Sequence, residues 1–284
     1  MLELLQQPFV QIGLAITLVA AGIHAYLGFH VVSRGVIFVD LALAQAAAFG
    51  YVVALMAGQG EHSGISYVVA LAFTLAGALL VSVSRDRNDR IPHEAFIGII
   101  YVGFAAAVMV ILAHLAEGTE VVSEITNGSI LNCTLGELWT VTALYVAVGL
   151  FHYFFRSKFF LISESRKSAS DMGLRIVWWD FLFYASFGVV VTYSVHLVGV
   201  LMVFSLLVIP PVTALLFTNR KGRRLVAGWL VAGAGSVIGI LVSLYFDLPP
   251  SPAIMLALIS ILVVAGIFRM ITGIGVSPMR ETVS

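Results

Sequence analysis

Charged residues are scarce in this chain of 284 residues. They make up 11% of it, and hydrophobic residues make up 60%, at a mean hydropathy of +1.04. Soluble domains carry roughly 25% charged residues, so this composition excludes a water-soluble fold. Cysteine occurs once, at Cys133, which excludes an internal disulfide. The sequence also contains no G-x-x-x-x-G-K-[ST] phosphate loop, which excludes ATP hydrolysis by that route.

Long hydrophobic runs account for most of the chain. A helix needs about 20 mainly apolar residues to cross roughly 30 Å of hydrocarbon, and nine segments of the sequence meet that requirement. They lie near residues 8–32, 36–58, 65–84, 95–116, 136–155, 177–194, 197–218, 225–246 and 251–270. The sequence therefore predicts an all-α, polytopic membrane protein of nine spans, with residues 1–284 forming a single transmembrane domain.

Lysine and arginine are missing from every second connection between the spans. All fifteen follow the first, third, fifth, seventh or ninth span. They are Arg34, Arg85, Arg87, Arg90, Arg156, Lys158, Arg166, Lys167, Arg175, Arg220, Lys221, Arg223, Arg224, Arg269 and Arg280. Connections rich in Lys and Arg stay in the cytoplasm, so the N-terminus is expected outside and the C-terminus inside the cell membrane. The net charge of zero arises because a positive bias on one side of the membrane cancels a negative bias on the other. It indicates no nucleic-acid partner.

The longest cytoplasmic connection runs from Arg156 to Arg175. Its part from Ser165 to Gly173 contains small and polar residues. This pattern predicts a short helix along the membrane surface, suited to docking on a partner. A solvated basic loop that only fixes the topology is an equally good interpretation.

The seventh span is interrupted by two adjacent prolines, Pro210 and Pro211, within Val198 to Phe217. Each proline removes a helix hydrogen bond and clashes with the carbonyl four residues back, so a break or kink is expected there. Broken helices within a bilayer are tolerated against protein or a water-filled cavity. The break therefore predicts that this span lines a transport path, and a kink used for packing is the alternative.

Several segments resemble, in order and spacing, the membrane subunits of zinc, manganese and iron ABC importers of the ABC-3 type. The resemblance rests on HLVGVLMVFSLLVIPPVTALLF at His196–Phe217, SRGVIFVDLALAQAAAFG at Ser33–Gly50, DRIPHEAFIGIIYVGFAAAVMV at Asp89–Val110, NGSIL at Asn127–Leu131 and DLPPSPAIM at Asp247–Met255. It covers nearly the whole chain.

The resemblance implies a permease without enzyme activity or cofactor of its own, carrying a divalent metal ion as substrate. It implies three protein partners: a second copy of the chain, cytoplasmic ATPase subunits and an extracytoplasmic metal-binding protein. In this family the ATPases grip a coupling helix in a cytoplasmic loop. The matching residues here are Ser165, Arg166, Lys167, Ser168, Ala169, Ser170, Asp171, Met172 and Gly173.

The chain departs from the family pattern at the ion site of the second span. The family's Asp falls on Leu41, and its His, four residues on, falls on Gln45. An Asp and a His at that spacing share a helix face and suit a divalent ion, whereas Leu offers no ligand and Gln a weak one. Asp40 lies about 100° round the helix from position 41. With His24 of the first span, provided that this helix packs on the second, Asp40 and Gln45 form a candidate substituted site.

Each of these residues also has a structural interpretation. Asp40 lies roughly 6 Å inside the expected end of its span and is within reach of a pairing with Arg34. Gln45 is suited to an interhelical hydrogen bond. Asp180 follows Trp178 and Trp179, a pattern typical of an interface anchor. Ser205 is expected to pack or to bond to the helix backbone.

The other histidines are expected near the two interfaces as solvated or hydrogen-bonded residues. The outer group is His62, His114 and His196, and the inner group is His30, His93 and His152.

Three functions remain open on these grounds. A divalent-metal ABC permease in the inner membrane fits best, and an ABC permease for a metal chelate or another small solute is favoured by the missing Asp and His. A secondary carrier or membrane enzyme fits less well. Carriers need buried ionisable groups in mid-membrane, and few are present. The sequence also shows neither an inverted repeat nor a nucleophile beside a base.

Overall fold

The computed structural model describes residues 6–60, 63–85, 91–114, 126, 128 and 130–273. Its long helices are α2 (Pro8–Arg34), α3 (Val39–Met56), α4 (Gly64–Val83), α5 (His93–Leu112), α7 (Leu135–Phe154), α10 (Ile176–Val198), α12 (Lys221–Phe246) and α13 (Pro250–Thr272). These eight are long and apolar enough to cross a membrane, and α11 (Val200–Leu215) is a shorter apolar helix. Eight of the nine expected spans are thus confirmed as helices of spanning length, and the seventh corresponds to the shorter helix α11.

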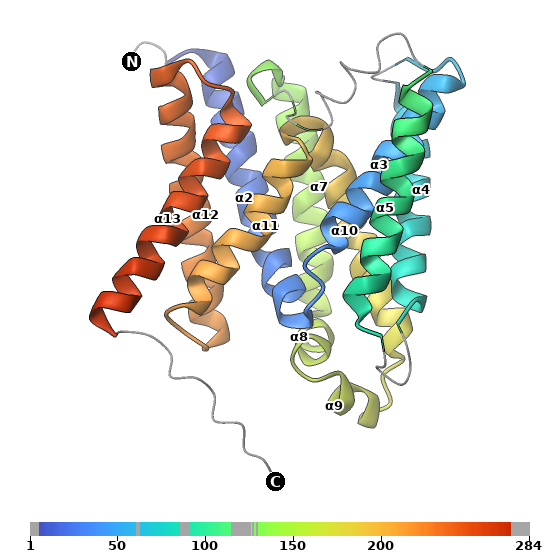
Figure 1. The fold of residues 1–284 in the computed structure, drawn as a ribbon, viewed down its shortest axis with the longest axis vertical. Coiled ribbons are helices and arrows are strands. Elements are labelled where there is room, and N and C mark those ends of the chain that lie inside the picture. The colour runs from blue at the N-terminus through green and yellow to red at the C-terminus, as the bar shows by residue number, and fades with distance from the viewer. Residues whose placement is uncertain are drawn as a thin grey trace.

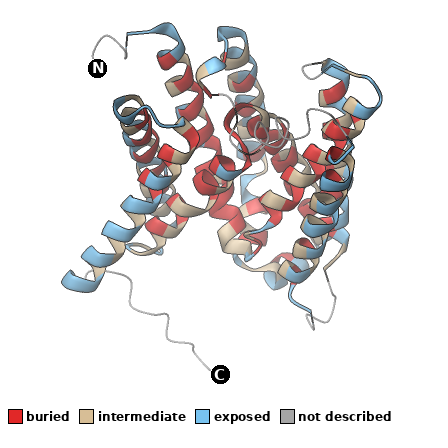
Figure 2. Cartoon of the chain, turned by 45° about the horizontal axis from the view of Figure 1, so that its top comes forward, coloured by how far each residue is buried: buried red, intermediate tan, exposed pale blue. Residues whose placement is uncertain are grey.

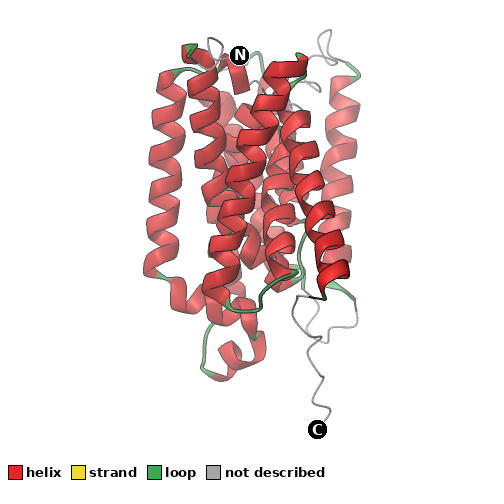
Figure 3. Ribbon diagram, turned by 90° about the vertical axis from the view of Figure 1, so that its left-hand side faces the viewer, coloured by secondary structure: helices red, strands yellow, loops and turns green. Residues whose placement is uncertain are grey.

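Short elements complete the described chain: the 3-10 turn η1 (Ile130–Asn132) and the helices α8 (Arg156–Glu164) and α9 (Arg166–Asp171). Figures 1 and 3 show α8 and α9 projecting together from one end of the bundle of long helices. The described residues contain no strand, which agrees with the predicted all-α class.

The long helices form two groups. In the first, α2 packs on α11 and α12, and α12 packs on α13; in the second, α3 packs on α4 and α5, and α4 packs on α10. Contacts of α11 with α10 and α3 join the groups, and α7 lies against α2 and α10. Figure 2 shows buried residues concentrated on the central helices, with exposed residues along the outer ones.

One residue, Gly199, separates α10 from α11, whereas the sixth and seventh expected segments end and begin at residues 194 and 197. Its backbone has φ 80° and ψ 152°, a combination that is essentially restricted to glycine. The chain therefore turns from one span into the next at a single position.

The expected break at Pro210 and Pro211 is wrong, because α11 runs as an α-helix from Val200 through both prolines to Leu215. Both prolines are buried. Pro211 cannot donate to the carbonyl of Leu207, four residues back, and Gly28 of α2 packs directly against that carbonyl and against the Pro211 ring. Helices cross this closely where a residue has no side chain, so the prolines form part of the α2–α11 packing. A kink at these residues remains a prediction.

Candidate functional site

The predicted short helix after the fifth span is confirmed as α9. The Ser165 hydroxyl caps it by accepting a hydrogen bond from the Ser168 amide at 3.2 Å, and the segment ends at Gly173 with φ 78°. Ser, as an N-cap, satisfies an amide that has no partner within the helix. Ala169 is buried against the rest of the protein, whereas Lys167 and Ser170 are exposed. The helix therefore presents a polar face away from the bundle.

Asp180 connects α9 to the spanning helices. This residue of α10 is buried, and its carboxylate accepts ion pairs from Arg34 at 2.9 Å and from Arg166 at 2.7 Å. The carboxylate is therefore enclosed by protein and paired, a role that the sequence did not predict. Its oxygens join the end of α2, the beginning of α9 and the first part of α10 in one cluster.

Arg34 is the centre of this cluster. Its guanidinium is buried, lies over the Phe183 ring at 3.9 Å and donates through Nε to the Ser163 hydroxyl at 2.9 Å. Ser163 donates its own proton to the carbonyl of Phe159 at 2.8 Å, so it accepts from Arg34 and from His30 Nδ1 at 2.9 Å. A hydrogen-bonded cation of this kind is held in one geometry.

A second hydrogen-bonded group lies beside the first. Ser186 donates to the carbonyl of Phe183 at 3.0 Å and so accepts from His152 Nε2 at 2.9 Å. His152 Nδ1 then accepts from the Tyr26 hydroxyl at 3.3 Å. The ring centroids of His30 and His152 are 6.5 Å apart, so the two groups form one buried polar cluster at the end of the molecule that carries α9.

The sequence did not predict that these residues form one cluster. Tyr26, His30 and Arg34 follow one another at intervals of four on α2, and residues at that spacing share a helix face. This spacing could have predicted that the three side chains act together on one face of α2. No sequence pattern marks Ser163 and Ser186, because their hydrogen-bond partners on other helices are distant in the sequence.

Asp40 is buried at the beginning of α3, and neither carboxylate oxygen has a hydrogen-bond partner among the described residues. The suggested pairing with Arg34 is wrong, since Arg34 is engaged by Asp180. Asp40 lies in the first helical turn, where the helix dipole favours a negative charge. A buried carboxylate without a partner is costly and marks a functional candidate.

Gln45 is half-buried, and within the described part of the chain no hydrogen bond to its side chain is formed. His24 is fully buried, donates from Nδ1 to the carbonyl of Ala20 at 2.8 Å and meets the Tyr145 ring edge-on. Its Nε2 has no partner among the described residues. Both side chains thus retain a free polar atom.

A joint site of His24 with Asp40 and Gln45 required the first span to pack on the second, and this packing is not observed. His24 belongs to α2, which packs on α11, α12 and α7, whereas Asp40 and Gln45 belong to α3, which packs on α4, α5 and α10. Among the residues that the structure describes, no three His, Cys, Asp or Glu side chains are grouped to hold a metal ion.

His93 and His114 agree with the hydrogen-bonded interpretation. His93 donates to the carbonyl of Val81 at 2.9 Å, and exposed His114 donates to that of Val110 at 2.9 Å. His62 lies outside the described residues. Ser205 donates to the carbonyl of Leu201 at 2.8 Å, as expected.

The fold and this cluster define a polytopic membrane protein in which a short helix outside the bundle is joined to the spans by buried ion pairs. A model of the ABC 3 transport family matches residues 6–269, and the chain belongs to that family.

Two curated relatives cover nearly the same length. The chain is 23% identical to a manganese transport system membrane protein, MntC, of Listeria monocytogenes, over 99% of this chain and 98% of that protein. It is 24% identical to a chelated iron transport system membrane protein, YfeD, of Yersinia pestis, over 92% of this chain and 86% of that protein. Among solved structures, PsaBC from Streptococcus pneumoniae in complex with Fab has the same fold, with a TM-score of 0.77, 20% identity and 92% of each chain covered.

Proposed function

We propose that this chain is the membrane-spanning permease of an ATP-driven importer for divalent metal ions, with zinc, manganese or iron as cargo. Two copies form the transport path, cytoplasmic ATPase subunits supply the energy, and an extracytoplasmic binding protein delivers the ion. The N-terminus is outside and the C-terminus inside. The family match over residues 6–269 is the observation that carries this proposal.

The α9 helix is the element on which the ATPase subunits act. Its exposed polar face supports that role, and so does its connection to the spans through Asp180. A force applied to α9 reaches α10 through Asp180 and α2 through Arg34, by way of these ion pairs. Coupling of this kind requires packed elements with defined contacts, and the buried ion pairs provide them.

The α3 helix is proposed to contribute Asp40 and Gln45 to the path. A carboxylate and an amide oxygen are both hard ligands that suit a divalent cation. The absence of a hydrogen-bond partner for either side chain in the described structure supports their availability. His24 is not part of this proposal, because its helix packs elsewhere.

A metal chelate is the second candidate cargo. Leu41 and Gln45 stand where the family resemblance places an Asp and a His, so the chain presents fewer charged ligands to a bare ion. A chelate arrives with its metal already coordinated and needs fewer protein ligands. The likeness to YfeD, named as part of a chelated iron system, points in the same direction.

Uptake measurements distinguish the two cargoes. Vesicles carrying the chain with its ATPase and binding protein are supplied separately with zinc, manganese and iron(II). We expect ATP-driven, saturable uptake of one ion, lost in Asp40→Asn and weakened in Gln45→Leu. Asp247→Asn is the matched control, because Asp247 is exposed at the far end of α12 with φ 53°, a conformation that Asn tolerates. A competent ATPase with no uptake of any free ion contradicts the metal-ion proposal and favours the chelate.

The Arg166→Gln substitution tests the role of α9. It removes the link between α9 and Asp180 and leaves the Arg34–Asp180 pair in place. We expect ATP hydrolysis to continue while uptake per ATP falls several-fold. Lys167→Gln removes the same charge from the neighbouring exposed position and is expected to leave the ratio unchanged. Equal effects of the two substitutions would show that charge on α9 matters and the link does not.

A further inference from the structure

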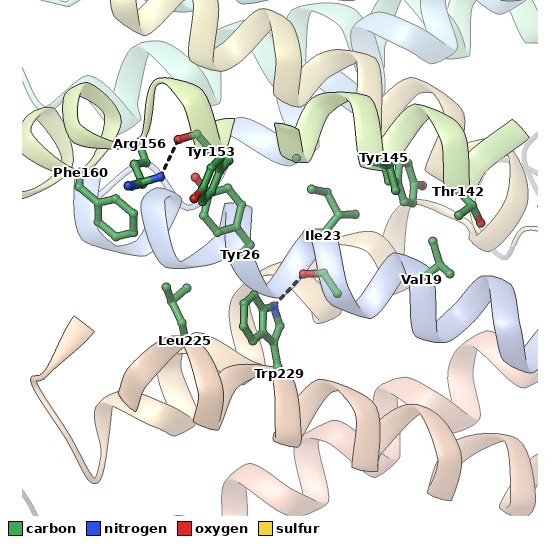
Figure 4. A pocket seen from close by; sticks show the side chains of 13 residues that line it. Val19, Ile23, Tyr26, Thr142, Tyr145, Tyr153, Arg156, Phe160, Leu225 and Trp229 are labelled. Carbon is green, nitrogen blue, oxygen red and sulfur yellow. Dashed lines mark hydrogen bonds between the residues drawn. The ribbon is translucent and has the colours of Figure 1, made fainter. Parts of the chain in front are cut away.

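A long groove follows α2 on the outside of the helix bundle. It lies between α7 and α12, which both flank α2, and it has a volume of ≈ 450 Å³. Figure 4 shows its walls: Val19, Ile23 and Tyr26 from α2 face Tyr145 and Tyr153 of α7, and Trp229 of α12 closes one side. Ligand pockets commonly have volumes of about 300–1,000 Å³.

The shape of the groove follows from the sequence. Thr142, Val146, Gly149 and Tyr153 share one face of α7 at intervals of three and four, and Gly149 and Gly22 hollow the two opposing walls. A Cβ atom at either glycine would meet no heavy atom within 4 Å. From Thr142 to Arg156 the groove extends roughly 20 Å along the helix axis, at 1.5 Å per residue. One leaflet of a bilayer contributes about half of the roughly 30 Å of hydrocarbon, so the groove can hold an acyl chain.

The groove opens to the surroundings of the protein. Val146, Tyr153 and Trp229 are 54%, 59% and 45% exposed, although they lie on helices long and apolar enough to span the membrane. Trp229 donates to the carbonyl of Gly22 at 2.9 Å and so spans from α12 to α2 along the groove. In the single chain the groove is therefore open along α7 and α12.

Positive charge gathers at the α8 end of the groove. Arg156 lies over the Tyr153 ring at 4.3 Å, and Lys221 is 5.9 Å from the Phe160 ring that lines the groove. Arg224 lies 4.6 Å over Phe29, whose ring centroid is 5.4 Å from that of Phe160.

These cations are not equally engaged. Lys221 pairs with Glu164, whereas the described structure shows no ion pair for Arg156 and no hydrogen bond for the buried Nε of Arg224. Neither arginine has an acidic partner among the described residues; Arg156 lines the groove, and Arg224 precedes the lining residue Leu225. The rest of the lining is apolar apart from hydroxyl groups and the Trp229 N–H.

We propose that the groove binds an anionic phospholipid of the inner leaflet, with an acyl chain along α2 and the phosphate held by Arg156 and Arg224. An apolar channel with cations at one end matches the shape and charge of such a lipid. Anionic lipids are concentrated in the cytoplasmic leaflet, where they attract basic segments. Tyr and Trp at the rim are the residues that prefer the membrane interface. The choice of leaflet takes the orientation from the proposed function.

Quenching of Trp229 by brominated lipid tests the site. The protein is reconstituted in phosphatidylcholine vesicles with increasing fractions of brominated phosphatidylglycerol. The signal of Trp229 is obtained by subtracting the quenching of the Trp229→Phe variant. We expect quenching that saturates at a low fraction of phosphatidylglycerol and is much weaker for brominated phosphatidylcholine. Free glycerol phosphate is expected not to reverse it, because the acyl chain contributes to binding.

Two substitutions test the two halves of the site. Arg156→Gln should raise the lipid fraction that gives half-maximal quenching roughly tenfold, because one charge-assisted hydrogen bond is lost. Gly149→Leu should abolish the saturable part of the quenching, because the larger side chain fills the groove. The controls are Arg175→Gln, exposed at the start of α10, and Gly103→Leu on α5, where an added Cβ also meets no atom.

Equal quenching by both lipids, or equal effects of test and control variants, would show ordinary boundary lipid and overturn the site. The vesicles contain the anionic lipid in both leaflets, and the assay needs neither ATP nor metal. Failure of the lipid site therefore leaves the transport proposal standing, and failure of transport leaves this result interpretable.

Discussion

Asp180 pairs with two arginines, one buried and one partly exposed. Arg34 and Asp180 have 1% and 2% of their side chains exposed, and Arg166 has 25%. Burying an ion pair is expensive, and its geometry must be good to recover the loss of hydration. Here the Arg34 guanidinium also bonds to Ser163 through Nε and stacks on Phe183, while its buried Nη2 has no hydrogen-bond partner among the described residues. The cluster is expected to fix the arrangement of α2, α9 and α10 more than to add stability.

The Asp180→Leu substitution should destabilise the protein by about 3–5 kcal/mol, because it leaves the buried Arg34 without its counter-charge. The double variant Arg34→Met with Asp180→Leu should recover much of that loss, since neither charge then remains in the interior. Thermal unfolding in detergent measures both effects. A single Asp180 variant as stable as the parent protein would mean that water reaches Arg34.

Cys133 is predicted to be unreactive in the folded protein. Burial, together with the charge of Glu137, raises the pKa of its thiol to about 12, and the thiolate is the species that reacts with maleimide. At pH 8 the thiolate fraction of the folded protein is then far below that of an ordinary cysteine with a pKa of about 8.5. Labelling at pH 8 should be at least roughly a hundredfold slower in detergent than after unfolding in dodecyl sulfate. Similar rates would show that Cys133 is exposed.

At the level of single residues, the sequence predicted the helix on which a residue lies better than it predicted the residue's hydrogen-bond or ion-pair partner. Asp40 is buried in α3, but its proposed pairing with Arg34 was wrong because Asp180 competes for the same cation. Asp180 looked like an interface residue since two tryptophans precede it, and only the packing of α10 against α2 and α9 shows it to be buried. Pairings across more than a hundred residues leave no local pattern to read.

At the level of helices, the crossing of α2 and α11 depends on Gly28. A Cβ atom there would collide with the Leu207 carbonyl group and lie 3.0 Å from Cγ of Pro211. Gly28→Ala should therefore force the helices apart and destabilise the protein by about 1–3 kcal/mol. Gly22→Ala on the same helix is the control, because an added Cβ there meets nothing within 4 Å and Ala is the better helix former. Thermal unfolding in detergent compares the two, and equal stabilities would show that the helices separate without cost.

The prolines of α11 illustrate why helix interruptions are hard to predict. Proline is expected to break an isolated helix. Within a membrane, however, backbone groups find no water to bond to, so a continuous helix satisfies most of their hydrogen bonds. The freed carbonyl of Leu207 lies at the crossing with Gly28, so the position of the prolines is tied to α2. The sequence shows the two prolines but not the partner glycine, which lies on a different helix.

At the level of the whole molecule, the spans were predictable because hydrocarbon thickness sets their length. Most observed helices begin and end within about three residues of the expected segments, and α9 was expected from its small and polar residues. The arrangement of the helices into two groups was not predictable, since it depends on side chains that face one another across α2, α10 and α11. Apolar surfaces that face lipid and apolar surfaces that face protein have the same composition.

The orientation of the molecule is the last prediction, and it follows from the one-sided distribution of Lys and Arg. Single cysteines are introduced into a Cys133→Ala background at Ser170 on α9 and at Gly60 in the connection after α3. Ser170 is exposed, and an added side chain at Gly60 meets no heavy atom within 4 Å. An impermeant maleimide should label Gly60→Cys in right-side-out vesicles and Ser170→Cys in inside-out vesicles only. The reverse pattern would place α9 outside the cell, away from ATP, and would exclude both α9 as the coupling element and the inner leaflet as the source of the bound lipid.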